Sequence, residues 1–91
     1  MKINKLLEII KDRKLKMPKG SYVASLFKSG GDRIIQKVGE EATEVVIAAK
    51  NKNKKGIISE VADLLFHLLV LLASLDITLP DIEKELESRN K

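Results

Sequence analysis

Two pairs of carboxylates have a spacing suited to binding a metal ion. Glu41 and Glu44 stand three residues apart in GEEATE, and Glu60 and Asp63 repeat this spacing in EVAD. Residues at i and i+3 lie on the same side of a helix, so each pair would present its oxygens together. Buried carboxylates are costly unless they are paired with cations or bind a metal. The repeated pair is therefore a candidate metal site.

The chemistry of these candidate ligands favours one class of ion. All four are carboxylates, which select a hard cation such as Mg²⁺ or Mn²⁺. Zinc is disfavoured because the chain has no cysteine and a single histidine, His67. Such a Mg²⁺ completes its coordination with water and substrate phosphates, which suits the hydrolysis of a phosphoanhydride. Arg33 and Lys37 lie close enough in the sequence to hold phosphate oxygens, and no Gly-rich Walker loop is present.

A salt-bridge network between helices is the alternative interpretation of the acids. Arg33 and Lys37 flank Glu44 on a helical wheel and could pair with it. One acidic pair alone would favour this interpretation, whereas two matched pairs on adjacent helices favour a metal site. His67 is more typical of a satisfied core or interface histidine than of a ligand. Its position near Asp63 still permits a contact with substrate or with a metal ligand.

The helical periodicity of the apolar residues predicts an all-α chain that forms one domain over residues 1–91. The expected helices span about residues 4–13, 22–28, 32–51, 57–75 and 78–89. Asn4, Ser21 and Asp32 are expected N-caps, and Thr78 is expected to open the last helix with Pro80 in its first turn. A tight turn, NKNKKG, joins the two long helices. They are therefore expected to be antiparallel, with both acidic pairs facing inward.

The helix expected over residues 57–75 is apolar on nearly every side, which is typical of a helix buried all round. A chain of 91 residues has little material to surround it. We therefore expect at least a homodimer, with Phe66, Leu69, Val70 and Ala73 among the buried contacts.

Composition limits the partners and the compartment. The formal net charge is +4, but none of the three aromatic residues lies in a basic cluster, so nucleic-acid binding has little support. The longest apolar run, residues 64–73, is far shorter than the ~20 residues that span a bilayer. The N-terminus is amphipathic and charged, unlike a signal peptide. We expect a cytoplasmic protein with neither a nucleic-acid nor a membrane partner.

Longer segments resemble a known family. GEEATE followed by EVADLLFHLLVLL resembles the EExxE…ExxD signature of the all-α, MazG-like nucleotide pyrophosphohydrolases. SYVASLFKSGGDRIIQKVGEE is similar to the pattern S-Y-T-x-x-L-F…G…R-I-x-Q-K-V-G-E-E of the phosphoribosyl-ATP pyrophosphohydrolase family, and LDITLPDIEKELESRN resembles its last helix. The resemblance covers about residues 6–89. Val23 stands where this family usually has Thr.

The resemblance implies a MazG-like bundle of four to five helices, completed by dimerisation. It also implies hydrolysis of phosphoribosyl-ATP to phosphoribosyl-AMP and pyrophosphate, the second step of histidine biosynthesis, with Mg²⁺. The implied metal ligands are Glu41, Glu44, Glu60 and Asp63. Glu40 is implied to act either as the general base or by contacting and orienting the metal ligands. The residues implied to lie near substrate are Ser21, Tyr22, Lys37 and His67. Since no zinc motif precedes the domain, we expect it to stand alone rather than behind a cyclohydrolase.

Two other functions remain open from the sequence. A MazG-type hydrolase of free nucleoside triphosphates would use the same acidic site, and only the segment from Ser21 to Glu44 argues against it. A non-catalytic helical dimerisation module would instead carry acids that are bound in salt bridges.

Overall fold

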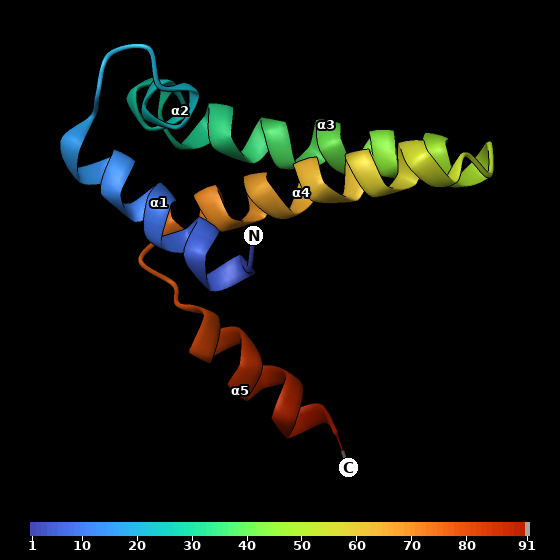
Figure 1. The fold of residues 1–91 in the computed structure, drawn as a ribbon. Coiled ribbons are helices and arrows are strands. Elements are labelled where there is room, and N and C mark those ends of the chain that lie inside the picture. Colours follow the sequence, from blue (N-terminus) through green and yellow to red (C-terminus); the bar gives the residue numbers. More distant parts are fainter. Residues whose placement is uncertain (91) are drawn as a thin grey trace.

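The computed structural model describes residues 1–90, which form five helices (Figure 1). Their bounds are α1 (Ile3–Lys16), α2 (Tyr22–Ser29), α3 (Gly31–Lys50), α4 (Lys54–Ser74) and α5 (Leu79–Arg89). No strand occurs between residues 1 and 90, so the predicted all-α class is confirmed.

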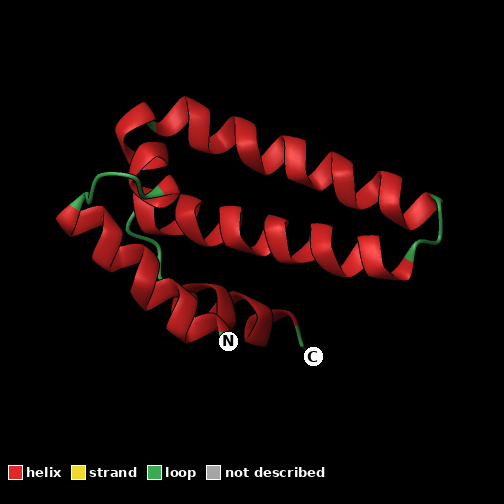
Figure 2. Ribbon diagram, turned by 45° about the horizontal axis from the view of Figure 1, so that its top comes forward, coloured by secondary structure: helices red, strands yellow, loops and turns green. Residues whose placement is uncertain are grey.

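The two long helices, α3 and α4, form an antiparallel hairpin that dominates the molecule (Figures 1 and 2). The turn between them ends at Asn53, whose side-chain oxygen accepts a hydrogen bond from the Gly56 amide at 3.1 Å. This cap starts α4 three residues earlier than the periodicity predicts. α1 packs on α4 and α2 packs on α3, both at the end of the hairpin far from the turn (Figure 1).

The hydrophobic core lies where α1 and α2 cover this end of the hairpin. Ile10 of α1 and Val70 of α4 are its largest fully buried side chains. The other buried members of the cluster are Leu7, Leu26, Ile34, Leu69 and Ala73. The expectation that Leu69, Val70 and Ala73 would need a second subunit to be buried is wrong, because α1 and α2 already supply their cover.

α4 is also not buried all round within one chain. Only four of its residues are buried, whereas Ile58, Val61 and Leu65 remain exposed along the part of the hairpin that α1 and α2 do not cover. Phe66 is partly buried against the core.

The helix starts only partly follow the expected caps. Ser21 and Thr78 cap α2 and α5 through their side chains, as predicted. Asn4 is not an N-cap, because α1 begins one residue before it, after Lys2. Asp32 is likewise not a cap: Gly30 holds that position with φ of 96°, and Asp32 lies inside the first turn. A carboxylate there still favours the helix, since it faces the positive end of the dipole.

α4 also meets the length and hydropathy requirements for crossing a bilayer, with a mean hydropathy of 2.0 over an 18-residue window. The core helix of a soluble protein meets the same requirements. α4 packs along α3 and carries Glu60, Asp63 and His67 near its middle. Ionisable side chains at that depth are rare in membrane-spanning helices, so the core helix is the interpretation we adopt.

Candidate metal centre

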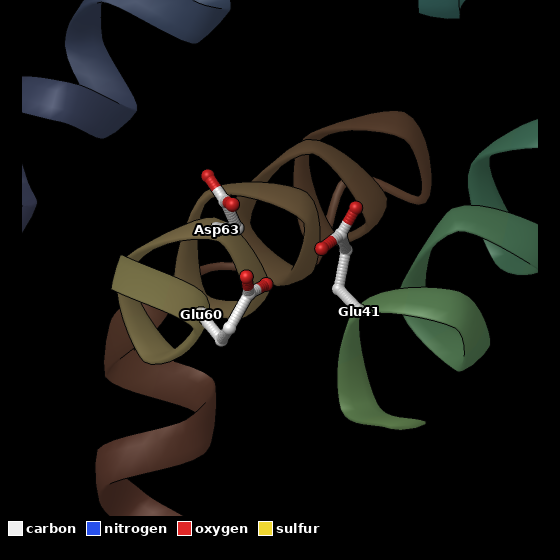
Figure 3. Close-up of side chains that lie close together, drawn as sticks. All are labelled: Glu41, Glu60 and Asp63. Atoms are coloured by element: carbon white, nitrogen blue, oxygen red, sulfur yellow. The ribbon is translucent and has the colours of Figure 1, made fainter. Parts of the chain in front are cut away.

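Three carboxylates from the two hairpin helices converge. Glu41 reaches from α3 toward Glu60 and Asp63 of α4 (Figure 3). One carboxylate oxygen of each lies within 4.8 Å of those of the other two. The antiparallel turn and the i,i+3 spacing on α4 produce this meeting, as the sequence predicts. Glu41 and Glu60 are partly buried, whereas Asp63 is exposed, so the cluster opens to solvent on one side.

The fourth expected ligand, Glu44, stands outside this group in the part of the chain that the structure describes. It is exposed on α3, although its charge still acts on Glu60. The pairing of Arg33 and Lys37 with Glu44, which the alternative salt-bridge interpretation allowed, is absent from residues 1–90. Arg33 is exposed and forms no ion pair within that range.

Lys37 is the one cation paired with this acidic cluster in residues 1–90. Its ammonium nitrogen lies 3.3 Å from Glu41 Oε1 and 3.4 Å from Glu40 Oε1. The side chains of Lys37 and Glu41 are only 17% and 14% exposed. Partial burial acts to lower the pKa of Lys37, but Glu41, the Tyr22 phenol and Glu40 outweigh it, so the pKa lies above its ordinary value. Lys37 is therefore firmly charged beside the cluster.

An aromatic group joins α2 to the helix that carries Asp63. The buried ring of His67 lies with Nδ1 2.8 Å from the Asp63 carbonyl oxygen and Nε2 3.1 Å from the Tyr22 hydroxyl. Since a carbonyl only accepts, Nδ1 carries the proton, and in the neutral ring Nε2 accepts from Tyr22. Phe66 stacks on Tyr22 with ring centroids 6.1 Å apart. This group fixes the start of α2 next to the cluster.

The sequence of the whole chain identifies the family of this site. The model of the phosphoribosyl-ATP pyrophosphohydrolase family matches residues 3–90, which include every carboxylate of the cluster. The chain belongs to this family. The resemblance seen in the segment from Ser21 to Glu44 is confirmed.

Individual relatives agree with the family match. A phosphoribosyl-ATP pyrophosphatase of Leptospira biflexa is 54% identical over 86 residues, covering 94% of each chain. One from Listeria innocua is 58% identical over 87 residues, covering 96% of this chain and 84% of the relative. A histidine biosynthesis bifunctional protein HisIE of Caldanaerobacter subterraneus is 57% identical over 89 residues. The chain spans only 43% of the length of that bifunctional protein.

The remaining residues that the family resemblance implies near substrate have structural partners. Ser21 Oγ accepts from the Ala24 amide at 3.1 Å as the cap of α2. Glu40 is exposed, pairs with Lys37 and accepts from Gln36 Nε2 at 3.0 Å. Tyr22 is about half exposed, so part of its side chain is accessible to a ligand. Their roles toward substrate remain predictions.

The sequence did not predict the Tyr22–Phe66–His67 group as a unit. Phe66 and Tyr22 are far apart in the chain, and their stacking depends on how α2 packs on the hairpin. The only signal was the separate implication of Tyr22 and His67 by the family pattern.

The donor set of the cluster fits the hard divalent cation expected for this family. Three carboxylates with no thiol or imidazole among them suit Mg²⁺ rather than zinc. Oxygens bound to one octahedral Mg²⁺ lie about 3 Å apart when adjacent and about 4.2 Å apart when opposite, so the three oxygens, now within 4.8 Å of one another, would move closer together on binding. The solvent-open side leaves room for water and substrate oxygens.

The cluster also predicts how the stability of the metal-free protein depends on pH. Partial burial raises the pKa of Glu60 above its ordinary 4.5, and the charges of Asp63, Glu44 and Glu41 raise it further. A carboxyl with a raised pKa in the folded state stabilises the fold fully below about pH 4.5, and this contribution is lost as pH rises through the raised value. As pH rises above about 4.5, the melting temperature of the metal-free parent should therefore drop relative to that of the Glu60→Gln variant. Identical pH profiles in chelator would contradict the expectation.

Proposed function

We propose that the chain hydrolyses phosphoribosyl-ATP to phosphoribosyl-AMP and pyrophosphate with Mg²⁺, the second step of histidine biosynthesis. The observation that carries the proposal is the meeting of Glu41, Glu60 and Asp63 inside a chain whose whole length matches the family. The printed names of the Leptospira and Listeria relatives support the same reaction.

In this proposal Glu41, Glu60 and Asp63 hold the cation, and Glu44 joins them after a turn of its exposed side chain. When bound, the ion would neutralise phosphate oxygens and orient the anhydride for attack by water. Lys37 lies beside the cluster and supplies a fixed positive charge for a phosphate oxygen. Glu40 is the candidate base that accepts the proton of the water.

The substrate residues surround this centre in the same proposal. Tyr22 presents the accessible part of its side chain to the nucleotide, while His67 acts through Tyr22 by fixing its hydroxyl. Ser21 holds the start of α2, and Arg33 lies on the exposed side of α3 where it can reach a more distant phosphate.

The substrate assignment is tested by comparing phosphoribosyl-ATP with ATP and other triphosphates in an assay of pyrophosphate release. We expect Mg²⁺-dependent release from phosphoribosyl-ATP and much weaker action on ATP. The alternative, a MazG-type house-cleaning enzyme, would share the metal site. Equal or faster turnover of simple triphosphates would transfer the assignment to it.

We also propose that the chain works as a homodimer. Exposed apolar side chains on α3 and α4 support this, namely Ile35, Val46, Ile47, Ile58, Val61 and Leu65. Gly39 of α3 has nothing within 4 Å of the position a Cβ would take, which leaves space for another helix. Sedimentation at micromolar concentration should give a dimer, and a folded monomer would contradict this.

Location and other partners follow from the reaction. A cytoplasmic biosynthetic enzyme, with no nucleic-acid or membrane partner, is the setting that we propose. Tyr22 and Phe66 stack beside His67, whose neighbours within residues 1–90 include no basic cluster, which supports a small-molecule substrate. Phe27 packs against the core, with Lys14 Nζ 6.0 Å from its ring centroid.

A further inference from the structure

α5 is the least supported element of the chain. It leaves the bundle after residue 78 and projects away from the other helices (Figure 1). Leu79 packs against the core, but residues 80–90 are all exposed. Helices shorter than about 12–15 residues are marginal in water without tertiary contacts, and α5 has 11 residues. Its stability therefore calls for a partner surface.

The sequence of α5 defines what this partner must offer. Leu79, Ile82 and Leu86 stand at i, i+3 and i+7, so they form one apolar side. Ile82 and Leu86 are exposed. The other positions carry four carboxylates and only two cations, in a chain whose net charge is +4. The matching surface is apolar and bordered by positive charge.

A groove of about 410 Å³ between α1 and the end of α4 has this character. Leu15, Ala73, Ile77 and Thr78 line it together with Lys11, Lys14 and Asp76. Lys14 is paired with Asp76 at 3.4 Å. Leu15 is 85% exposed, although it is a large apolar side chain. Lys11 has no ion-pair partner within residues 1–90. An acidic amphipathic helix would cover the leucine and meet the free lysine.

The α5 of the same chain is directed away from this groove. The Thr78 amide donates to Asp81 Oδ2 at 2.9 Å, and the Asp81 amide donates to Thr78 Oγ1 at 3.2 Å. Lys14 holds the preceding connector, donating to the Ala73 carbonyl at 2.7 Å and lying 3.4 Å from Asp76. The capping box satisfies two otherwise unpaired amides and fixes the first turn of α5 on Thr78.

We propose that α5 of one copy packs Ile82 and Leu86 into the groove beside Leu15 of a second copy of this chain, and that the second copy reciprocates. A two-fold arrangement makes both contacts at once, because helix and groove belong to the same chain. The acidic helix is complementary in charge to Lys11, whereas Lys14 is already paired with Asp76. This inference rests on the self-association proposed above and not on the catalytic assignment.

The absence of cysteine from the sequence allows a direct test. Leu15→Cys and Leu86→Cys variants are purified separately, mixed at micromolar concentration and oxidised mildly. A disulfide between the two different variants, at twice the chain mass, is expected. Leu15→Cys mixed with Ser88→Cys is the matched control, because Ser88 lies about 200° around α5 from Leu86. This control should give little product.

Each alternative outcome has a clear meaning. Equal cross-linking with Ser88→Cys would indicate random collision and overturn the proposal. A disulfide formed within one chain of the Leu15→Cys/Leu86→Cys double variant, with no product between chains, would place α5 on its own groove. A dimer in sedimentation without either product would overturn the α5 contact and leave the hairpin association standing.

As a second measurement, Leu86→Glu should weaken dimerisation about tenfold or more, and Ser88→Glu should not. Equal effects of the two substitutions would also overturn the proposal.

Discussion

Replacing Asp63 with Asn is expected to remove most activity while leaving the metal-free protein as stable as the parent, or more so. The change removes one charge at nearly constant shape. Asp63 has no cation partner in residues 1–90, and its nearest charged neighbours are carboxylates. Its loss relieves repulsion in the metal-free protein and removes one of the proposed metal ligands. Turnover should fall at least about 100-fold, because changing residues that only hydrogen-bond to metal ligands already costs up to about 100-fold.

Thermal melts with and without Mg²⁺, run beside the pyrophosphate assay, check this expectation. Mg²⁺ should stabilise the parent by mass action and the variant less. Glu8→Gln on α1 is the control, since it removes an exposed carboxylate far from the cluster and should change neither quantity. If a salt-bridge network instead held a cation on Asp63, the variant would strand that cation and lose about 3–5 kcal/mol. A variant that melts well below the parent in chelator yet keeps its turnover would contradict the metal site.

Replacing Lys37 with Met should have the opposite effect on the metal-free protein. Lys37 is the one cation in residues 1–90 that neutralises the cluster, and its removal leaves Glu41 among carboxylates only. The variant should therefore melt below the parent in chelator. It should regain more stability on addition of Mg²⁺, because a competing positive charge is gone. Turnover should fall at least about tenfold if the ammonium binds a phosphate in the transition state.

The matched control is Lys5→Met, which breaks an exposed i,i+3 pair with Glu8 at 3.8 Å. Exposed pairs of this kind contribute about 0–1 kcal/mol, so its melting temperature should stay near that of the parent. A Lys37→Met protein that gains no more from Mg²⁺ than the parent would show that Lys37 does not compete with the ion.

The meeting of Glu41, Glu60 and Asp63 could be predicted from the sequence because it depends only on helical periodicity and a tight turn. The placement of Glu44 and Lys37 could not. The placement of Glu44 depends on its side-chain conformation. A helical wheel places Lys37 beside Glu44 but ignores the rise of about 10.5 Å between them, whereas Glu40 and Glu41 lie one turn from Lys37. The starts of α1 and α3 were missed because Lys2 and Gly30 take cap positions without a side-chain signal.

Burial was the weakest expectation. A uniformly apolar helix indicates that something covers α4, but not what covers it. At its C-terminal half α1 and α2 supply the cover, so Leu69 and Val70 are buried in one chain. The direction of α5 could not be predicted either, because it is set by the connector that Lys14 holds from α1. Contacts between residues so distant in the chain leave no local pattern.

The central claim is that the acids of α3 and α4 bind the divalent cation that hydrolysis requires. Calorimetric titration of Mg²⁺ into chelator-treated, desalted parent tests it most directly, with Asp63→Asn titrated beside it. A saturable site in the parent, strongly weakened in the variant, is the expected result. A helical interaction module would show no such site. The claim would be contradicted by a parent that binds no Mg²⁺ at millimolar concentration and still releases pyrophosphate from phosphoribosyl-ATP in excess chelator.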